Sequence, residues 1–367
     1  MDSQKNYDYK ICMVSDQLAT GGAERYAAYL SQYFEQNRIK VHHVIVVDKV
    51  DYEYSGELLN LGKLKNESNG ILNRMNRFWV LRQFFKKNKF DYIIDFRVKR
   101  FQIQEIFIAK YIYKSPLIVV VQNYITDLYF PINKFLANRI YSSNSAIVSV
   151  TDSIKNKILA NYVYKEVSVI SNPIDFTFIE TKLDEDLNID YKYILAVGRM
   201  EDNVKQFDKL IHCYAKSILP EKDIKLIILG DGKLKSDFIQ LAIDFNLADK
   251  IVFKGHVKNP FPYYKNAFFM VLSSLNEGLP FVLIESLICE TPVVAFDCNS
   301  GPSEIIINKE NGLLVENQNQ EKLIFAMNEM ILNENLYYHC KSNAKESMKK
   351  FKIKNIGQQW LKLLKLE

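Results

Sequence analysis

The sequence has little cysteine, proline and glycine, and it lacks any long apolar run. Its 367 residues include five cysteines, nine prolines and thirteen glycines. The cysteines are odd in number and far apart, and no pair has the spacing of a metal or redox motif, so we expect buried free thiols. No stretch reaches about 18 consecutive apolar residues, so we expect no membrane-spanning helix. The N-terminus lacks the features of a signal peptide, which predicts a cytoplasmic protein or one bound to a membrane surface from that side.

The sequence also gives little support for a metal site, a dinucleotide-binding site or a nucleic-acid-binding surface. The five histidines form no H-x-x-x-H helix face, and the run Asp184-Glu185-Asp186 does not follow a strand, so we expect no protein-held metal. The dinucleotide fingerprint G-x-G-x-x-G is absent, which disfavours a dehydrogenase. Nucleic acid is not an expected partner, because the net charge is only +5 and no binding motif is present.

The length of the chain and its hydrophobic pattern favour two α/β domains. At roughly 150 residues per domain the length predicts two, and a 48% hydrophobic composition supplies two cores. Short apolar β-branched runs alternate with helical stretches, as in doubly wound parallel sheets covered by helices. We predict strands at Ile11–Ser15, Val41–Val47, Tyr92–Phe96, Pro116–Val121 and Ala146–Val150, then at Tyr193–Val197, Lys225–Leu229, Ile251–Phe253, Phe268–Leu272 and Pro292–Phe296.

The domain boundary is expected in the acidic, aperiodic stretch 175–191, which follows the turn signal Asn172-Pro173. We therefore predict one domain over residues 1–176 and a second over 190–350. A last helix near 354–365, within a segment 351–367, carries apolar residues on one face and needs a groove to bury them.

Two motifs follow predicted strands. Gly21-Gly22-Ala23-Glu24-Arg25 opens a helix predicted at Ala23–Gln36. Paired glycines there allow close approach of a ligand, and the helix start offers N–H groups to an anion. Gly198-Arg199 follows the strand Tyr193–Val197, with Lys205 six residues further on. Because ligands bind at the carboxyl ends of parallel strands, this Arg and Lys are suited to a diphosphate, although each could be an ordinary solvated cation.

The sharpest motif is EGLPFVLIE at residues 277–285. Glu277 follows the strand Phe268–Leu272, and Pro280 suits the first turn of a helix that continues from Phe281. The stretch from Gly278 through Leu279 to Val282 therefore directs N–H groups at the sheet edge, which favours a phosphate. Glu285 lies on the strongly apolar helix, so a surface role is disfavoured. The turns Gly301-Pro302-Ser303 and Gly230-Asp231-Gly232 lie at the same edge but are common and unspecific.

These elements together resemble the retaining GT-B glycosyltransferases of glycosyltransferase family 4. The resemblance rests on GGAER at 21–25, SNPID at 171–175, GRMEDNVK at 198–205, GDG at 230–232, FKGHV at 253–257, EGLPFVLIE at 277–285 and SGPSEII at 300–306. It implies two Rossmann-like domains facing across a cleft, with the last helix crossing back to the first domain. It also implies a hexosyltransferase like bacterial enzymes that assemble surface polysaccharides or lipid-linked glycans.

The resemblance further implies a donor site for a nucleotide sugar, with UDP the commoner nucleotide. Arg199 and Lys205 would neutralise the diphosphate, and Gly22 would approach it from the other domain. Glu277 would contact the sugar, and Glu285 would bind the ribose. His256 and Val257 would lie beside the base, with Gly198, Gly230 and the segment Gly278, Leu279, Pro280 and Phe281 completing the site. Arg199, Lys205 and Glu277 are the expected catalytic residues, with retention of configuration and no metal or other cofactor.

The sequence departs from the family pattern at one position on the side of the expected acceptor. Many relatives have a histidine in a loop of the first domain near the sugar, where Asn123 stands here. An amide can bind a hydroxyl but cannot carry a proton near neutral pH. Asp16 and Asp95 are weak candidates for the group that activates the acceptor, and each could be an ordinary loop or strand-end acid.

Residues 71–89 form a predicted basic helix with six Lys and Arg and no acid. Ile71, Met75, Phe78, Leu81 and Phe85 share one face, whereas Trp79 and Phe84 lie off it and could face lipid headgroups. A solvated helix packed by one face is the alternative. The membrane interpretation implies a lipid-linked saccharide acceptor. A soluble acceptor, or a non-catalytic subunit that binds nucleotide sugar, remains an open alternative.

Overall fold

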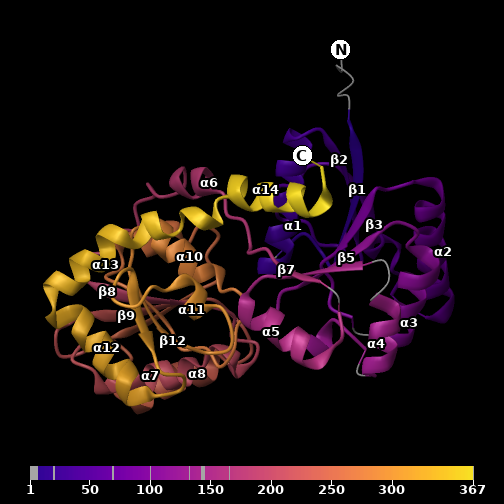
Figure 1. Ribbon diagram of the computed structural model, residues 1–367. Coiled ribbons are helices and arrows are strands. Elements are labelled where there is room, and N and C mark those ends of the chain that lie inside the picture. Colours follow the sequence, from indigo (N-terminus) through magenta and orange to yellow (C-terminus); the bar gives the residue numbers. More distant parts are fainter. Residues whose placement is uncertain are drawn as a thin grey trace. The chain divides into compact units, whose positions relative to one another are not determined.

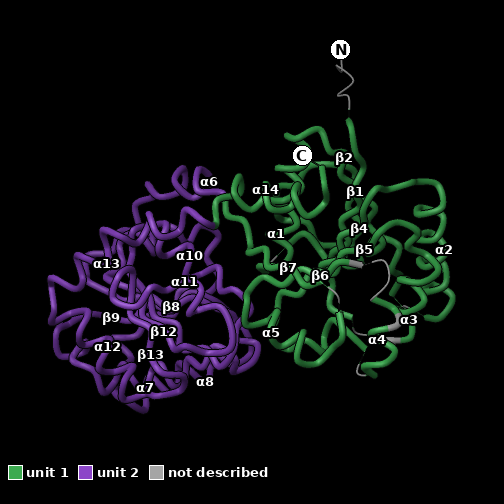
Figure 2. Tube along the Cα trace, viewed as in Figure 1, with its two compact units in different colours: residues 1–174, 351–367 green, residues 175–350 purple. Residues whose placement is uncertain are grey.

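The computed structural model describes residues 7–19, 21–67, 70–99, 101–131, 133–141, 145–164 and 166–366. The chain forms two compact units (Figure 2): unit 1 comprises residues 1–174 and 351–367, and unit 2 comprises 175–350. Residues 177–189, which the sequence-based prediction assigned to neither domain, belong to unit 2. All five cysteines are free and buried, as the sequence predicts.

Unit 1 is a parallel sheet with helices around it (Figure 1). Its strands are β1 (Tyr9–Ser15), β2 (Ile39–Ile45), β3 (Glu57–Asn60), β4 (Tyr92–Asp95), β5 (Leu117–Val121), β6 (Ser145–Ser149) and β7 (Val167–Val169). Its helices and helical turns are α1 (Gly22–Gln36), η1 (Gly62–Leu64), α2 (Ile71–Lys87), α3 (Gln102–Phe107), η2 (Ile108–Ile112), η3 (Thr126–Leu128), α4 (Lys134–Tyr141), α5 (Asp152–Asn161) and α14 (Ile353–Leu364). The turn η5 (Lys349–Phe351) leads into α14.

Unit 2 repeats this plan with a second parallel sheet (Figure 1). Its strands are β8 (Tyr193–Val197), β9 (Lys225–Leu229), β10 (Ile251–Gly255), β11 (Met270–Leu272), β12 (Val293–Phe296) and β13 (Gly312–Val315). Its helices and turns are α6 (Phe176–Glu180), η4 (Asn203–Lys205), α7 (Phe207–Lys216), α8 (Lys235–Asp244), α9 (Phe261–Asn266), α10 (Phe281–Ile288), α11 (Pro302–Ile305), α12 (Gln320–Leu332) and α13 (Glu334–Ser347).

The strand order explains which strands the sequence revealed. The sheets run β3-β2-β1-β4-β5-β6-β7 and β10-β9-β8-β11-β12-β13. Every predicted strand is present, and every residue of a central strand such as β5 is buried, which makes its sequence continuously apolar. The strands that the prediction missed, β3, β7 and β13, are all edge strands of three or four residues. Short edge strands leave little apolar pattern to detect.

Each sheet has a topological switch point where the strand order reverses. The switch lies between β1 and β4 in unit 1 and between β8 and β11 in unit 2. The connections leave these paired strands toward opposite sides of the sheet, which opens a crevice at the carboxyl ends where ligands bind in this class of fold. Residues that follow β1, β4, β8 and β11 are therefore the first candidates for function.

The final helix packs on the first unit, as the apolar face of its sequence predicts. Trp360 of α14 is fully buried against Tyr26 and Phe34 of α1, and its Nε1–H donates a hydrogen bond of 2.7 Å to the Tyr26 hydroxyl. A Cβ on Gly357 would lie 2.3 Å from the Tyr33 ring, so only glycine permits this approach. The entry to α14 is held by a backbone bond of 2.9 Å from the Ile174 N–H to the Phe351 carbonyl.

The substitution Trp360→Ala is expected to destabilise unit 1 by about 3–5 kcal/mol, because it empties a buried site and removes the partner of Tyr26. Denaturant unfolding followed by circular dichroism measures this change. Lys362→Ala on the exposed side of α14 is the control and should have little effect. Equal stability of the two variants would contradict the packing described.

Candidate active site

Two loops of unit 2 meet at its switch point. The loop after β8 runs from Gly198 to Lys205, and the loop after β11 begins at Ser273. The Ser273 hydroxyl donates a bond of 2.8 Å to the Lys205 carbonyl, and the Leu275 N–H donates one of 2.8 Å to the Val204 carbonyl. The two loops are therefore fixed to each other, so side chains that they carry have defined positions.

Lys205 and Glu277 are in direct contact at this edge. The Lys205 Nζ lies 2.6 Å from Glu277 Oε1, and the Ser274 hydroxyl donates to the same oxygen at 2.6 Å. Their side chains are 19% and 13% exposed, so both are accessible but restrained. The structure thus brings together two of the three residues expected to be catalytic, and it adds Ser274, which the sequence analysis missed.

Two residues that follow strands of unit 2, Gly198 and Gly230, are glycines because other atoms approach them closely. A Cβ on Gly198 would lie 2.8 Å from Lys205 Cγ, so the lysine stem crosses directly over this residue. Gly230 follows β9 with φ at +137°, and a Cβ there would lie 1.8 Å from the Gly198 carbonyl oxygen. Two of the glycines expected at the donor site therefore have a structural requirement: Gly198 admits the Lys205 side chain, and Gly230 admits the Gly198 carbonyl.

The segment from Glu277 to Pro280 rests on the loop after β12. The Glu277 N–H donates to the Asn299 carbonyl at 2.7 Å, and the Ser300 hydroxyl donates to the Gly278 carbonyl at 2.9 Å. A Cβ on Gly301, whose φ is +97°, would lie 2.5 Å from the Gly278 oxygen. Leu279 and Pro280 are buried, and α10 begins at the next residue, Phe281. The positive end of a helix is thereby placed at the same sheet edge as Lys205.

The remaining donor-site candidates lie at or below this edge. Arg199 is exposed and makes no ion pair with any residue that the structure describes. His256 is exposed after β10, and Val257 beside it is half-buried. Glu285 is buried in α10 and accepts a hydrogen bond of 3.2 Å from the Tyr264 hydroxyl. Its expected contact with a ribose stays a prediction.

In unit 1, the donor-side candidate Gly22 and the expected acceptor-side residues differ in their settings. Gly22 is the first residue of α1. Asp16 is half-buried directly after β1, where its carbonyl accepts bonds from the Val46 and Val47 N–H groups. Asn123 follows β5, and its Oδ1 accepts a bond of 2.8 Å from the Ile125 N–H. This Asx turn fixes the loop and engages the single side-chain oxygen of Asn123.

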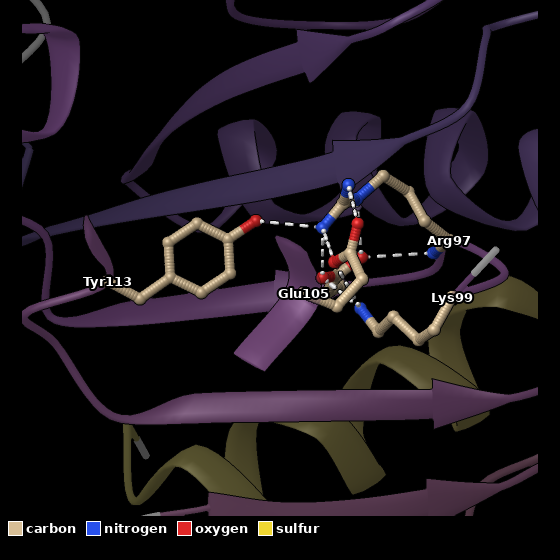
Figure 3. Close-up of polar contacts among 5 residues, drawn as sticks. Arg97, Lys99, Glu105 and Tyr113 are labelled. Carbon is tan, nitrogen blue, oxygen red and sulfur yellow. Dashed lines mark hydrogen bonds and ion pairs between the residues drawn. The ribbon is translucent and has the colours of Figure 1, made fainter. Parts of the chain in front are cut away.

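Asp95 is part of a buried ion-pair cluster with Arg97, Lys99 and Glu105. Figure 3 shows the side chains of these three partners and of Tyr113. Its two oxygens accept from Arg97 Nε at 3.1 Å and Nη2 at 2.9 Å, and the Lys99 ammonium contacts the carboxylate as well. Arg97 also binds Glu105 in bidentate fashion, at 2.8 and 3.2 Å, and lies 3.3 Å from the Tyr113 hydroxyl.

Opposing effects set the pKa of the Asp95 carboxyl. Burial favours the neutral acid, but the adjacent charges of Arg97 and Lys99 prevail and lower the pKa to about 2. A carboxylate with this pKa takes up no proton at neutral pH, and Asp95 has no exposed surface. The suggestion that Asp95 activates an acceptor is therefore wrong on physical grounds, and the residue is a structural anion.

Three buried polar atoms at the carboxyl edge of unit 1 were missed by the sequence analysis. Ser15 Oγ, Gln122 Nε2 and Thr126 Oγ1 are buried and have no hydrogen-bond partner among the described residues. Ser15 ends β1, and the other two follow β5. A polar residue at the end of an apolar strand was the available signal. Such atoms are uncommon in folded proteins and indicate groups that bind something further, water included.

The helix α2 confirms one part of the predicted pattern and corrects the rest. Leu81 and Phe85 are buried as expected, but Ile71 and Met75 of the same predicted stripe are exposed. Trp79 is exposed as expected, whereas Phe84 packs against Phe90 with ring centroids 5.7 Å apart. The prediction treated the helix as one stripe, but only its second half lies against the sheet.

Two kinds of feature are absent from the described residues: a metal-binding cluster and a membrane-spanning helix. No group of three or more His, Cys, Asp and Glu side chains is placed to hold a metal ion in the part of the chain that the structure describes. No helix within the same residues is both long and apolar enough to cross a bilayer.

Family models match both halves of the chain. The model described as Glycosyltransferase Family 4 matches residues 20–178, and the model described as Glycosyl transferases group 1 matches residues 179–347. The two matches follow one another and together account for most of the sequence.

Two relatives from Campylobacter jejuni are similar over nearly their whole length. One is N-acetylgalactosamine-N,N'-diacetylbacillosaminyl-diphospho-undecaprenol 4-alpha-N-acetylgalactosaminyltransferase, 29% identical, with 95% of this chain and 97% of the relative covered. The other is GalNAc-alpha-(1->4)-GalNAc-alpha-(1->3)-diNAcBac-PP-undecaprenol alpha-1,4-N-acetyl-D-galactosaminyltransferase, also 29% identical, with 97% and 98% covered.

Solved structures share the fold of the chain. Anabaena HepE in complex with UDP and glucose has a TM-score of 0.76 at 19% identity, with 98% of this chain and all of that chain covered. Staphylococcus aureus TarM, in a complex that includes UDP, has a TM-score of 0.76 at 16% identity, with 97% and 99% covered. These likenesses confirm two Rossmann-like units of the GT-B type.

The substitution Asp95→Asn is expected to cost about 3–5 kcal/mol at pH 7, because it leaves Arg97 and Lys99 with one carboxylate in place of two. The folded pKa of Asp95 is below its ordinary value of 3.8, so the ion pairs stabilise the fold above about pH 4. That stabilisation is lost as the pH falls through about 2.

The difference in unfolding free energy between wild type and Asp95→Asn should therefore shrink between about pH 4 and pH 2. Denaturant unfolding at several pH values measures it. Asp8→Asn removes an exposed ion pair with Arg38 of 3.0 Å and is the matched control, with an expected cost below about 1 kcal/mol. A pH-independent deficit for Asp95→Asn would show that its charge is not involved.

Proposed function

This chain belongs to the family 4 glycosyltransferases, and on that premise we propose that it transfers a hexose or N-acetylhexosamine from a nucleoside-diphosphate sugar to a lipid-linked saccharide. UDP is the proposed nucleotide, and the configuration of the sugar is retained. The observation that carries this proposal is the contact of Lys205 with Glu277 at the switch point of unit 2, 2.6 Å between Nζ and Oε1.

The leaving group of such a reaction is a nucleoside diphosphate, whose negative charge increases as the glycosidic bond breaks. Lys205, the exposed Arg199 and the start of α10 supply positive charge at one sheet edge. Donors fixed before the reaction stabilise the transition state, and each contributes about 2.7–4 kcal/mol. These groups can neutralise the diphosphate without a metal ion, so we propose metal-independent transfer.

Glu277 is suited to hold the sugar that is transferred. Lys205 and Ser274 both bind its Oε1 and neither uses its Oε2, so the second oxygen can accept hydrogen bonds from sugar hydroxyls. Because Lys205 touches Glu277, the diphosphate and the sugar attached to it would be held next to each other. This geometry matches the two halves of a nucleotide sugar.

The proposed acceptor comes from the relatives, two of which are named for substrates on a diphospho-undecaprenol carrier. We place the protein at the cytoplasmic face of a bacterial membrane, with residues 71–89 toward the anionic surface. The exposed Ile71, Met75 and Trp79 of α2 support this placement. Nucleic acid is not a proposed partner. A soluble acceptor remains the second candidate.

The test is transfer from radiolabelled UDP-sugars to lipid-linked saccharides extracted from bacterial membranes, without added divalent metal and with soluble saccharides in parallel. The proposal expects label in the lipid phase and an α-linked product from an α-linked donor. Transfer to soluble saccharides alone would overturn the lipid-linked acceptor. Donor binding without transfer to any acceptor would favour the non-catalytic alternative.

The variants Lys205→Ala and Arg199→Ala are each expected to raise the dissociation constant for UDP and to lower turnover by about 10²–10³-fold. Kinetics and calorimetry measure the two effects. Lys322→Ala removes a lysine that makes an equally short ion pair, 2.6 Å to Glu316, on a different helix. This control should keep wild-type kinetics, and wild-type kinetics in both test variants would exclude the diphosphate assignment.

The variant Glu277→Gln is expected to lower turnover by a larger factor than it weakens UDP binding, because the carboxylate is assigned to the sugar. The comparison uses kcat for transfer and the dissociation constant of UDP on the same preparation. Equal losses in both quantities would move Glu277 to the nucleotide.

A further inference from the structure

Two adjacent serines follow β11 and hold different parts of the contact between Lys205 and Glu277. The Ser273 hydroxyl lies on the backbone of the loop after β8, where the carbonyls of Lys205 and Gln206 accept it at 2.8 and 3.2 Å. The Ser274 hydroxyl instead donates to the Glu277 side chain, at 2.6 Å to Oε1. One serine therefore fixes the loop that carries the lysine, and the other fixes the carboxylate.

The position of the Ser274 hydroxyl is itself well defined. Ser274 has no exposed surface. Its carbonyl accepts a hydrogen bond of 3.4 Å from Gln318 Nε2, and Gln318 Oε1 accepts one of 2.5 Å from the Lys209 ammonium. Gln318 follows β13 and Lys209 lies on α7, so a further loop and a helix support the serine. Because a single torsion separates the backbone of a serine from its hydroxyl oxygen, holding the backbone also places that oxygen.

Lys205 alone does not set the orientation of the Glu277 carboxylate. Its ammonium is a compact charge with rotatable donors on a flexible four-carbon stem. The terminal torsion of a glutamate side chain is broad and two-fold, so a lysine can follow the carboxylate to either rotation. The buried hydroxyl of Ser274 has one proton to donate and one place from which to donate it. It therefore selects the rotation in which Oε1 faces the protein.

The second carboxylate oxygen stays open for a ligand. Oε2 of Glu277 receives no hydrogen bond from any residue that the structure describes. In the proposed reaction the Lys205 ammonium also binds the diphosphate, whose charge competes with Glu277 for it. Ser274 is then the donor to Glu277 that does not change partner. It keeps Oε1 in place, and Oε2 toward the ligand, while the nucleotide sugar is bound.

We propose that Ser274 is a positioning residue for sugar transfer, which acts through Glu277 by holding Oε1 so that Oε2 is directed at hydroxyls of the transferred sugar. The inference rests on the proposed function, and it adds a residue that touches neither the diphosphate nor the sugar. The Ser274 hydroxyl contributes to turnover and not to nucleotide binding, because Ser273 holds the loop of Lys205 without it.

The kinetic test compares Ser274→Ala with Ser217→Ala in the transfer assay with radiolabelled UDP-sugars. Ser217 is the matched control, because it is a buried serine of unit 2 whose hydroxyl donates at 2.7 Å to a backbone carbonyl at the end of α7. Losing a hydrogen bond to a charged group should lower kcat about 10- to 100-fold in Ser274→Ala, with the dissociation constant of UDP within about twofold of wild type. Ser217→Ala should change neither quantity.

Two further variants test whether the hydroxyl acts through Glu277. Ser274→Cys keeps the site filled but offers only a weak S–H donor, so turnover should stay low, and this variant replaces Ser274→Ala if the latter does not fold. In a Glu277→Ala background, Ser274→Ala should lower the single-turnover rate by less than about twofold, because residues that act through one contact are not additive. Wild-type turnover in Ser274→Cys, or a full further loss in the Glu277→Ala background, would overturn the inference.

Crystal structures of wild type and Ser274→Ala test the geometry without any sugar transfer. The inference expects a rotated or disordered Glu277 carboxylate in the variant, with the backbone of residues 273–277 unchanged. An unrotated carboxylate would overturn it. A rotated carboxylate together with no transfer by wild type would count against the proposed function, and the positioning of Glu277 would stand. Transfer by wild type with equal kcat in Ser274→Ala and Ser217→Ala would count against this inference alone.

Discussion

The arrangement of side chains at the switch point of unit 2 depends on the absence of a side chain at Gly198. The lysine stem of Lys205 crosses over this residue, and Gly230 approaches its carbonyl oxygen from the neighbouring strand. A Cβ at Gly198 would displace the Lys205 side chain, and a Cβ at Gly230 would collide with the Gly198 carbonyl and separate the loops after β8 and β9. Because the loop after β8 is bonded to the loop after β11, the same contact determines where Glu277 lies relative to Lys205. The contact between Lys205 and Glu277 is thus a consequence of close packing at the switch point of the sheet.

The two units use charge in opposite ways at the switch points of their sheets. In unit 1 the charges near the end of β4 neutralise one another: Asp95 and Glu105 are balanced by Arg97 and Lys99, and all four are buried. In unit 2 Arg199 remains exposed, and Lys205 shares its charge with one partially exposed carboxylate. A closed network rigidifies a loop, whereas an open one retains attraction for an anionic ligand.

The sequence predicted the central strands, the loops that follow β8 and β11, and the apolar face of the last helix, because each leaves a local pattern. Residues 193–197 are continuously apolar, and 277–285 combine a loop acid, a proline and an apolar helix. The edge strand β13 and the exposure of Ile71 were not predictable in this way, since both depend on what packs alongside. Asp95 was misjudged for the same reason: its sequence position gives no sign that Arg97 and Lys99 fold back onto it. The contact of Ser274 with Glu277 likewise follows from loop geometry alone.

The central claim is that the edge holding Lys205 and Glu277 binds a nucleoside diphosphate, and thermal unfolding of the whole chain tests it most directly. Wild type and Lys205→Ala are heated with UDP, GDP, ADP or NAD in the absence of metal. A ligand at 100 times its dissociation constant stabilises the native state by about 2.7 kcal/mol. The account predicts a rise in melting temperature of wild type with UDP and a much smaller rise for Lys205→Ala. A rise with NAD alone, no rise with any nucleotide, or an equal rise in both proteins would contradict it.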